Sequence, residues 1–524
     1  MRPRRQKRQV YYLKRSIALI ISGLVLSSCN PQNEKTAPRP NIIVILSDDM
    51  GFSDLGCYGG EIETPNLDRL AENGLRFTEF YATARCWPTR ATLMSGRYSD
   101  QLGSSQVTIA ELLKTVGYQT SMAGKWHLSK TATENGPIQR GFDSYYGAIV
   151  GGGSYWRPPG LTRNTQAVEP DSPDYYYTEK IGDEALKQIQ VFAQSPEPFF
   201  QYVAFTSPHW PLHAREEVIQ KYINRYQTGW PALRQNRYKR MIKMGLIDEK
   251  RWPLPDPEPV VQDWDSVDHK EWRVRNMAVY AAMIDHMDQA IGQIVSALKA
   301  TGQLENTLII FTNDNGACSE HLSGNAWNTA NNVLEWAKTQ GKTISMGDEM
   351  DVETGGPLTF HSVGRNWANA QNTPLRRYKA NVHEGGACVP CIMHWPEGMK
   401  QAAGSITRQR GHMVDILSTC IELAGASYPG NFEGNSILPN EGTSLVNVIQ
   451  GRNQDPQRAY YFKHQGTHAI IKGDWKIVRE KAGDNKWHLY NLTREKTEIT
   501  DHAESMPEKV KELAGLWETR FGEK

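Results

Sequence analysis

Oxygen-bearing side chains follow two stretches of the sequence that have the composition of buried β-strands. Asp48 and Asp49 come directly after the apolar run at residues 41–47. Asp314 and Asn315 come directly after a second such run. Carboxylate and amide oxygens are the ligands that hard cations such as Ca²⁺ and Mg²⁺ prefer, whereas Zn²⁺ normally takes His or Cys. Either pair alone would be read as a turn or helix cap, but two pairs at two strand ends favour a cation site.

Basic side chains follow two further runs of the same kind. Lys125 and His127 come after residues 118–123, and His209 comes after residues 198–206. In open α/β sheets, ligands bind beyond the carboxyl ends of the strands. Taken singly, these residues would be read as an exposed lysine and core histidines. Four strands that each end in metal-type or titratable residues indicate instead that all of them contribute to one site.

Cys86 opens the segment Cys-Trp-Pro-Thr-Arg at residues 86–90. Pro88 suits the first turn of a helix. Cys86 is therefore predicted to lie at a helix N-terminus, where free N–H groups and the helix dipole favour anions. From the residues alone, two interpretations stay open. The cysteine is either a nucleophilic thiolate of low pKa or a buried residue near a turn.

The motif around Cys86 resembles the signature of the formylglycine-dependent sulfatases, a family of the alkaline-phosphatase-like superfamily. The usual signature is Cys-x-Pro-Ser-Arg with a downstream Thr-Gly or Ser-Gly. Here Thr89 stands where Ser is usual, and Ser-Gly follows at residues 95–96. The resemblance extends over residues 40–520. Its further matches, in the order the family has them, lie at residues 45–49, 124–127, 207–212, 313–316, 374–379, 384–386, 414–416 and 472–476.

The resemblance implies an arylsulfatase-type enzyme that hydrolyses sulfate esters. A formylglycine-generating enzyme would oxidise Cys86 to formylglycine (3-oxoalanine), whose hydrate presents two hydroxyl groups. One divalent cation, Ca²⁺ or else Mg²⁺, would be held by Asp48, Asp49, Asp314, Asn315 and the modified Cys86. The other catalytic residues implied by the motifs are Arg90, which holds the formylglycine oxygens, and Lys125, His127, His209 and Lys379.

The family mechanism assigns these residues their roles. One formylglycine hydroxyl attacks the sulfur, with Asp314 as cation ligand and base. Lys125, Lys379 and His209 clamp the sulfate oxygens. Either His209 or Lys379 protonates the leaving alkoxide. His127 then takes the proton of the second hydroxyl, which expels sulfate and restores the aldehyde.

Two other functions stay open at this point. A phosphoester or phosphonate hydrolase of the same superfamily would typically use two transition metals, a Ser or Thr nucleophile and additional His ligands, whereas Asn315 follows Asp314 here. A sugar-binding lipoprotein without catalysis would keep the fold alone, although every expected catalytic position is filled. For a sulfatase, the substrate would be a sulfated carbohydrate or an aryl sulfate. Loops rich in aromatic residues and Arg, at residues 151–159 and 212–268, would form the rim that selects it.

The elements that must position these residues are short apolar runs alternating with amphipathic helices. This pattern predicts an α/β fold with a large, mostly parallel sheet flanked by helices. A capping box at residues 108–111 and a long amphipathic stretch at 273–300 mark two of the helices. Four short strand-like runs and a helix at 507–520 predict a smaller C-terminal antiparallel sheet. The predicted domains are a catalytic domain, residues 41–442, and a C-terminal α+β subdomain, residues 443–524.

The first residues read as a bacterial export signal. Residues 1–28 hold seven Lys/Arg and no Asp/Glu, and their apolar run is too short to span a bilayer permanently. Because the run ends in a lipoprotein-type cleavage box, Cys29 is predicted to be lipidated, with residues 29–40 as a tether; an ordinary secretory signal is the alternative. The protein would then lie in the cell envelope, periplasmic or on the outer membrane, held by a lipid anchor only. The rest of the chain is net acidic, which argues against nucleic-acid binding.

The chain has seven cysteines. Apart from Cys29 and Cys86, five remain: Cys57, Cys318, Cys388, Cys391 and Cys420. An odd number in an exported protein argues against a full disulfide framework. The Cys388–Cys391 pair is a C-x-x-C but lacks a second Cys/His pair at zinc spacing. We therefore expect buried structural cysteines, and the sequence leaves open whether two of them form a disulfide.

Overall fold

The computed structural model describes residues 39–98, 101–323, 331–480 and 482–522. From Arg39 onward the chain forms one compact unit. The predicted signal, the lipidation site Cys29 and most of the tether lie outside the described residues, so they stay predictions. No helix among the described residues is long and apolar enough to cross a membrane.

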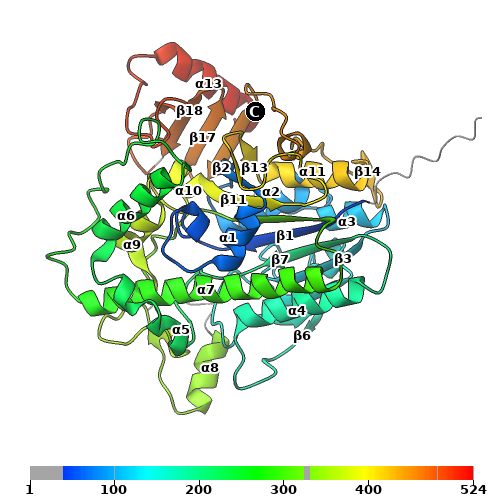
Figure 1. Cartoon of the computed structure of the whole chain (residues 1–524), viewed down its shortest axis with the longest axis horizontal. Coiled ribbons are helices and arrows are strands. Elements are labelled where there is room, and N and C mark those ends of the chain that lie inside the picture. Colours follow the sequence, from blue (N-terminus) through cyan, green and yellow to red (C-terminus); the bar gives the residue numbers. More distant parts are fainter. Residues whose placement is uncertain (1–38, 99–100, 324–330, 481, 523–524) are drawn as a thin grey trace, which may run out of the picture. The chain divides into compact units, whose positions relative to one another are not determined.

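An eleven-stranded sheet runs through the larger part of the fold (Figure 1). Strands β8, β1, β7, β3 and β4 run parallel to one another, and β11 runs antiparallel to β8 and β2. The prediction of a large, mostly parallel sheet is therefore confirmed. The strand bounds are β1 Asn41–Ser47, β2 Leu75–Tyr81, β3 Gln119–Gly124, β4 Ser144–Ala148, β5 Leu161–Arg163, β6 Gln166–Ala167, β7 Phe199–Ala204, β8 Thr307–Asn313, β11 Cys388–His394, β12 Ser405–Thr407 and β13 Gly411–His412.

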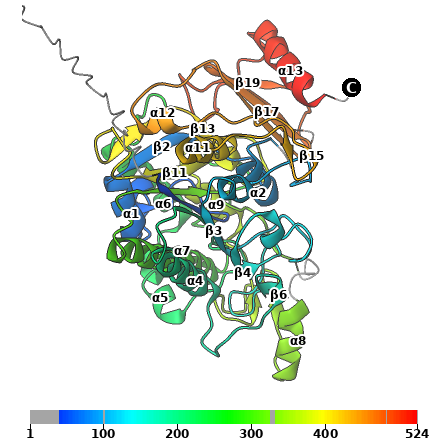
Figure 2. The same cartoon turned by 90° about the vertical axis from the view of Figure 1, so that its right-hand side faces the viewer.

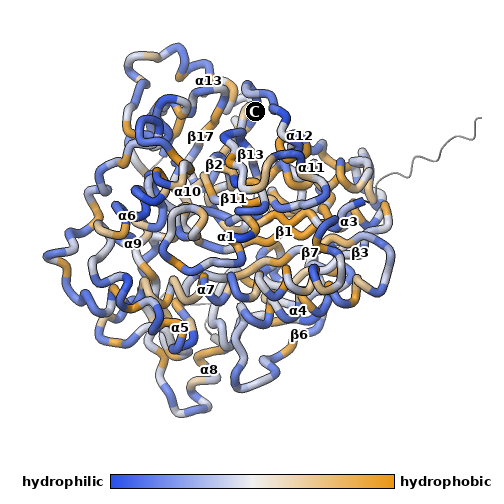
Figure 3. Tube along the Cα trace, in the orientation of Figure 1, coloured by the Kyte–Doolittle hydropathy of each residue, from blue (hydrophilic) through white to orange (hydrophobic). Residues whose placement is uncertain are grey.

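Strand β1 shows why these runs form the centre of the sheet. Ile43 and Ile45 belong to the hydrophobic core on one face, and Ile42, Val44 and Leu46 belong to the core on the other. A strand buried on both faces reads as a continuous apolar run instead of an alternating one. The same runs appear as hydrophobic segments at the middle of Figure 3.

Helices cover both faces of the sheet (Figure 2). Residues of α1 (Pro65–Glu72), α4 (Tyr177–Phe192) and α7 (Lys270–Ala300) pack into one core. Residues of α2 (Cys86–Ser95), α3 (Ile109–Lys114) and α11 (Val414–Ala424) pack into the other. The capping box predicted at residues 108–111 is present at the start of α3. The other elements are α5 Glu216–Gln220, α6 Gly229–Lys243, α8 Asn331–Thr339, α9 Gly364–Gln371, α10 Glu384–Ala387, α12 Val446–Ile449, the 3-10 helices Gly56–Tyr58, Ile138–Arg140 and Ile223–Arg225, and the short strands β9 Ser345–Met346, β10 Thr359–Phe360, β14 Asn431–Phe432 and β15 Asn435–Ser436.

The insertion at residues 212–268 was expected to contribute to a substrate rim, but its tryptophans pack inside the protein. Trp230 and Trp264 meet at 4.7 Å between ring centroids, and Trp230 also meets Trp367 at 5.4 Å. All three are buried. Their ring contacts stabilise the insertion against α9, so these tryptophans are not available to a substrate.

The described cysteines are free and buried, as expected for structural residues. Cys388 and Cys391 lie on opposite faces of β11, because Cys388 joins one hydrophobic core and Cys391 the other. The C-x-x-C is therefore a sequence coincidence within a strand and forms no disulfide.

A four-stranded antiparallel sheet packed by one helix follows at the C-terminal end, as predicted. Its strands are β16 Ala459–His464, β17 Thr467–Lys472, β18 Trp475–Glu480 and β19 His488–Asn491, and the helix is α13 Pro507–Phe521. The helix packs its Leu513 and Trp517 against Ile470, Ile477 and Leu489 of the sheet.

A buried charge cluster fastens this sheet to α10. Lys476 of β18 places its Nζ 2.7 Å from Glu384 Oε1 and 2.8 Å from Glu498 Oε1. Lys496 also pairs with Glu384, and Tyr81 donates its hydroxyl to the same carboxylate at 3.1 Å. The charged side chains of Glu384, Lys476 and Lys496 are fully buried. Burial by itself would raise the pKa of Glu384, but the two lysines outweigh it and lower this pKa to about 2.

Glu384→Gln should destabilise the protein, because it leaves two buried lysines short of a partner. We expect a loss of about 3–5 kcal/mol in the free energy of unfolding, measured by urea denaturation at pH 7. The pKa of Glu384 falls on folding from its ordinary 4.5 to about 2. Its stabilising effect is therefore complete above pH 4.5 and is lost as the pH falls toward 2. The difference in the free energy of unfolding between the wild type and Glu384→Gln should therefore narrow as the pH falls from 4.5 to about 2.

Glu512→Gln is the matched control. Glu512 pairs with Lys509 on α13, and its side chain is about half exposed. An exposed pair of this kind contributes about 0–1 kcal/mol. Equal effects of the two substitutions at pH 7 would contradict the assigned role of the buried cluster.

Candidate active site

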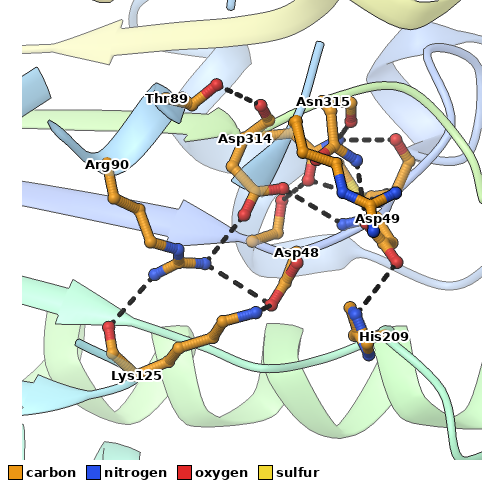
Figure 4. A network of polar contacts seen from close by, with 12 residues as sticks. Asp48, Asp49, Thr89, Arg90, Lys125, His209, Asp314 and Asn315 are labelled. Atoms are coloured by element: carbon orange, nitrogen blue, oxygen red, sulfur yellow. Dashed lines mark hydrogen bonds and ion pairs between the residues drawn. The ribbon is translucent and has the colours of Figure 1, made fainter. Parts of the chain in front are cut away.

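The acidic residues meet because β1 and β8 are neighbouring parallel strands in matched register. Ser47 pairs with Asn313, so the residues that follow the two strands lie side by side (Figure 4). Asn315 donates its amide to Asp49 Oδ1 at 2.8 Å, and the Asp49 backbone N–H donates to Asp314 Oδ1 at 3.3 Å.

Two buried cations hold the acidic residues from one side. Arg90, in α2, places Nη2 2.9 Å from Asp314 Oδ2 and 3.5 Å from Asp48 Oδ2. Lys125, just after β3, pairs with Asp48, and its carbonyl accepts from Arg90 at 3.1 Å. Burial alone would raise the pKa of Asp48, but Lys125, His209 and Arg90 outweigh it and lower this pKa. Burial and the Asp48 charge raise the pKa of Asp314 to about 8.

Lys379 and His209 approach Asp49 from the other side. Lys379 Nζ lies 2.7 Å and His209 Nε2 lies 3.5 Å from Asp49 Oδ2. His209 Nδ1 is 2.6 Å from the Trp210 carbonyl oxygen. Since a carbonyl only accepts, Nδ1 carries the proton and Nε2 faces the site without one. Burial lowers the pKa of His209 to about 4, which keeps the ring neutral.

The segment that carries Lys379 is tied to two other parts of the site. The Lys379 backbone N–H donates to the Ala317 carbonyl at 3.0 Å, just beyond the β8 residues. The Ala380 N–H donates to the Ala84 carbonyl at 2.7 Å, two residues before Cys86. Although burial lowers it, the carboxylate of Asp49 raises the pKa of Lys379 well above its ordinary value. The side chain is therefore protonated at neutral pH.

The oxygen-rich cluster has the donors that a hard cation needs. Asp48 Oδ1 and Asn315 Oδ1 are buried, and neither has a hydrogen-bond partner among the described residues. Buried polar atoms normally have a partner, so these two oxygens are available as ligands. Ligand atoms of Asp48, Asp49 and His209 also lie within 4.8 Å of one another. We give more weight to Asp314 than to His209 as a ligand, because Ca²⁺ and Mg²⁺ take oxygen donors.

Cys86 begins α2, as predicted, with 3% of its surface exposed. Burial raises the pKa of its thiol, although Lys125 and Lys379 act in the opposite direction. The interpretation of Cys86 as a thiolate of low pKa is therefore wrong. The N-terminus of a helix favours a thiolate only where water or partners solvate it, and the neighbouring Asp48 and Asp314 disfavour it further.

Thr89 connects α2 to the end of β8. Its hydroxyl donates to the Asp314 carbonyl at 2.7 Å and accepts from the Thr83 backbone N–H at 3.0 Å. The sequence has Thr where the family usually has Ser, and both residue types offer this hydroxyl. The substitution therefore keeps the group that holds Cys86 beside the acidic residues.

His127 lies at the partly exposed mouth of the site, next to Trp87, with 6.0 Å between the ring centroids. Its Nδ1 is buried and has no hydrogen-bond partner among the described residues. Burial and the charges of Lys125 and Arg90 hold its pKa well below the ordinary value. The neutral ring can therefore accept a proton.

Two partly exposed residues at this mouth, Arg85 and Glu320, escaped the sequence reasoning. Arg85 Nη1 lies 2.7 Å from Glu320 Oε1, and the Trp210 indole N–H donates to Glu320 Oε2 at 2.8 Å. Glu320 follows no strand directly and belongs to no matched motif. Only the fold brings it to Arg85, so no signal in the sequence could have identified the pair.

A glycine segment covers the two histidines. A Cβ added to Gly151 would lie 2.4 Å from His127 Nε2, and one added to Gly152 would lie 3.0 Å from His209 Cε1. The loop at residues 151–159 was expected at the substrate rim, and these glycines do lie against the site. Glycine is needed at both positions because any side chain would displace an imidazole.

Comparisons with known proteins agree with this geometry. A family model described as Sulfatase matches residues 40–426. An uncharacterized sulfatase of Schizosaccharomyces pombe is 31% identical, over 91% of this chain and 93% of its own length. The arylsulfatase of Klebsiella aerogenes is 30% identical, over 82% of this chain and 96% of its own. A protein solved with its substrate D-glucosamine-2-N,6-O-disulfate shares the fold, with a TM-score of 0.59 at 20% identity, over 92% of this chain and 97% of that one.

Gly151→Ala should impair turnover while leaving the fold intact. The added methyl group would push His127 from its position, and a displacement of about 1 Å at such a residue can cost about a hundredfold in rate. We expect kcat to fall about that much and the melting temperature to change little. Gly356→Ala is the control, because a Cβ at that position meets no atom within 4 Å. Equal kcat values for the two variants would contradict the role of Gly151.

Proposed function

We propose that this chain, which belongs to the sulfatase family, uses two groups to cleave sulfate esters. One is a formylglycine made from Cys86, and the other is a single bound divalent cation. As a sulfatase it is an enzyme that hydrolyses sulfate esters. The observation that carries the finer proposal is the position of Cys86. Its side chain is buried, and its thiol is close enough to Asp48, Asp314, Lys125 and Lys379 for their charges to act on its pKa.

This environment suits a nucleophile that does not have to ionise first. A thiolate at position 86 is disfavoured by burial, as its raised pKa indicates. Formylglycine supplies, as its hydrate, a hydroxyl that attacks sulfur and a second one that allows sulfate to be released. A formylglycine-generating enzyme would be the partner that makes this modification.

The cation would be held by Asp48, Asp49, Asp314 and Asn315, which offer only oxygen donors. Asp48 Oδ1 and Asn315 Oδ1 are buried and unpartnered, which supports this assignment. When bound, such a cation neutralises charge that develops on oxygen and helps to orient the reacting groups. We propose Ca²⁺, with Mg²⁺ as the alternative that the experiment below distinguishes.

Lys125 and Lys379 supply the positive charge for the sulfate group. Both are buried, and a buried ammonium stabilises a developing negative charge far more than one in water does. Lys379 is also the better candidate for protonating the leaving alkoxide. His209 donates its Nδ1 proton to the Trp210 carbonyl, and the Nε2 that faces the site carries no proton. Lys379 Nζ, by contrast, carries protons and lies next to Asp49.

His127 is suited to the release of sulfate. Its ring is neutral and near Cys86, because it packs against Trp87 of the same helix turn. It can take the proton from the second formylglycine hydroxyl, as the aldehyde re-forms and the bond from that carbon to the sulfate oxygen breaks. Gly151 lies against this ring, since a Cβ added there would come within 2.4 Å of His127 Nε2.

The phosphoester hydrolase is less well supported than the sulfatase. Within the part of the chain that the structure describes, one group of His, Cys and acidic residues has the spacing of a metal site, and it contains Asp48, Asp49 and His209. A typical two-metal phosphoester site needs a second group. For the substrate we propose a sulfated carbohydrate, with an aryl sulfate as the alternative; the fold neighbour described above was solved with a sulfated sugar.

The modification of Cys86 can be tested by mass spectrometry of the protein from its native host. In the peptide that contains Cys86, sulfur and two hydrogens should be replaced by one oxygen. The peptide with Cys420, another buried cysteine, is the internal control and should keep its thiol. Cys86→Ala should lower kcat by about 10³-fold or more, since the nucleophile is removed. An intact thiol at position 86 in an active preparation would contradict the formylglycine proposal.

The cation can be tested by chelation. Removal of divalent ions with EDTA should abolish turnover and lower the melting temperature. Addition of Ca²⁺ at a hundred times its Kd should restore about 2.7 kcal/mol of stability. Asn315→Ala should raise the Ca²⁺ concentration for half-maximal activity by at least about tenfold, whereas Asn453→Ala, at an exposed position, should not. Full activity in EDTA would overturn the proposal, and better recovery with Mg²⁺ would reassign the ion.

A further inference from the structure

We propose that His464, at the end of β16, and Trp87, beside Cys86, form a wall that recognises the sugar carrying the sulfate ester. This inference rests on the proposed sulfatase function and adds a specificity-determining residue from outside the large sheet. It makes the C-terminal sheet part of the substrate site.

The ring contacts place His464 at the site. Its ring meets the Trp87 ring at 5.6 Å between centroids and 67° between planes, and Trp87 also meets His127 at 6.0 Å. Trp87 therefore contacts both a proposed catalytic histidine and His464. The turn after β16 is fastened here as well, because Thr467 donates its hydroxyl to the Ala380 carbonyl at 3.3 Å. Ala380 is the neighbour of Lys379.

His464 has a ring nitrogen without a hydrogen-bond partner among the described residues. Only 3% of the residue's surface is exposed, and this nitrogen, Nε2, is buried. An unsatisfied buried nitrogen costs about 1–3 kcal/mol, a cost that a ligand hydroxyl would remove. Burial, together with the Arg85 and Lys379 charges, outweighs a side-chain hydrogen bond with Gln465 and lowers the pKa of His464 to about 4, so a neutral ring is the form that meets the substrate.

The chemistry of this wall favours a sugar over an aryl group. A hydroxyl both donates and accepts, so it can bind a neutral imidazole nitrogen in either tautomer. Trp87 is partly exposed and offers an apolar face, with the Arg85 guanidinium 5.3 Å from its ring centroid. Glu320 is fixed by Arg85 and Trp210 and keeps lone pairs that accept further hydroxyl groups. Apolar faces combined with fixed polar groups match a polyhydroxylated ring.

The test compares two substrates of different leaving group. The probes are 4-nitrophenyl sulfate and the member of a panel of O-sulfated monosaccharides that the wild type cleaves fastest. His464→Ala should lower kcat/KM for the sugar sulfate by about tenfold more than kcat/KM for the aryl sulfate. His464→Gln, which retains a hydrogen-bonding side chain of similar reach, should recover part of the loss on the sugar.

His468→Ala is the matched control. His468 belongs to β17 of the same sheet, but its ring stacks on Trp517 of α13 at 4.2 Å between centroids, away from Trp87. This variant should keep the ratio of the two kcat/KM values, and melting temperatures of all variants should be recorded. An equal loss on both substrates for His464→Ala, or no loss on either, would overturn the inference.

The same assay separates this inference from the proposed function. If the wild type, with formylglycine verified at position 86, cleaves no sulfate ester at all, the proposed function fails. If the wild type cleaves 4-nitrophenyl sulfate but none of the sugar sulfates, the sulfatase function stands and the sugar wall is overturned.

Discussion

Three buried carboxylates held beside three buried cations are the interaction on which the rest of the structure depends. Parallel pairing of β1 with β8 brings Asp48, Asp49 and Asp314 together, with no more than 1% of any of them exposed. Carboxylates this close repel one another in a medium of low dielectric constant. Arg90, Lys125 and Lys379 offset that repulsion. The repulsion that remains contributes to the raised pKa of Asp314. Each cation comes from a different segment, so helix α2, the end of strand β3 and the segment before α10 must all dock to offset the carboxylates.

This balance of charge also explains the chemistry that the site favours. Burial and the nearby carboxylates raise the pKa of Cys86, and burial keeps His127 and His209 neutral. Ionisation of any of these groups within the site is disfavoured. The proposed hydrate nucleophile delivers a hydroxyl without a preformed anion, and the histidines rest in the neutral form that can accept a proton. In the proposed mechanism the positive charges of Lys125 and Lys379, which pair with Asp48 and Asp49 here, also attract the sulfate group.

Much of the fold and part of the site could be predicted from residue pattern, for a definite physical reason. Strand β1 coincides with the apolar run at residues 41–47, and β8 ends at the residue before Asp314. A strand buried on both faces leaves a local pattern, and polar residues at its end are visible beside it. The pairing of Glu320 with Arg85 and the approach of His464 leave no such pattern. For Cys86 the residue pattern left a thiolate and a buried residue both open, and the burial of the side chain decides against the thiolate of low pKa.

The position of Lys379 shows why the C-terminal sheet belongs to the same functional unit. Lys379 lies five residues before Glu384, and Glu384 is anchored to Lys476 of β18 in a buried pair. The segment between them is held at its start by bonds to Ala317 and Ala84. The sheet therefore fixes one end of the segment that carries Lys379, the proposed sulfate-binding cation, and its strand β16 brings His464 into contact with Trp87. A boundary near residue 443 separates two sheets in the sequence, but the wall and the charge of the site are completed across it.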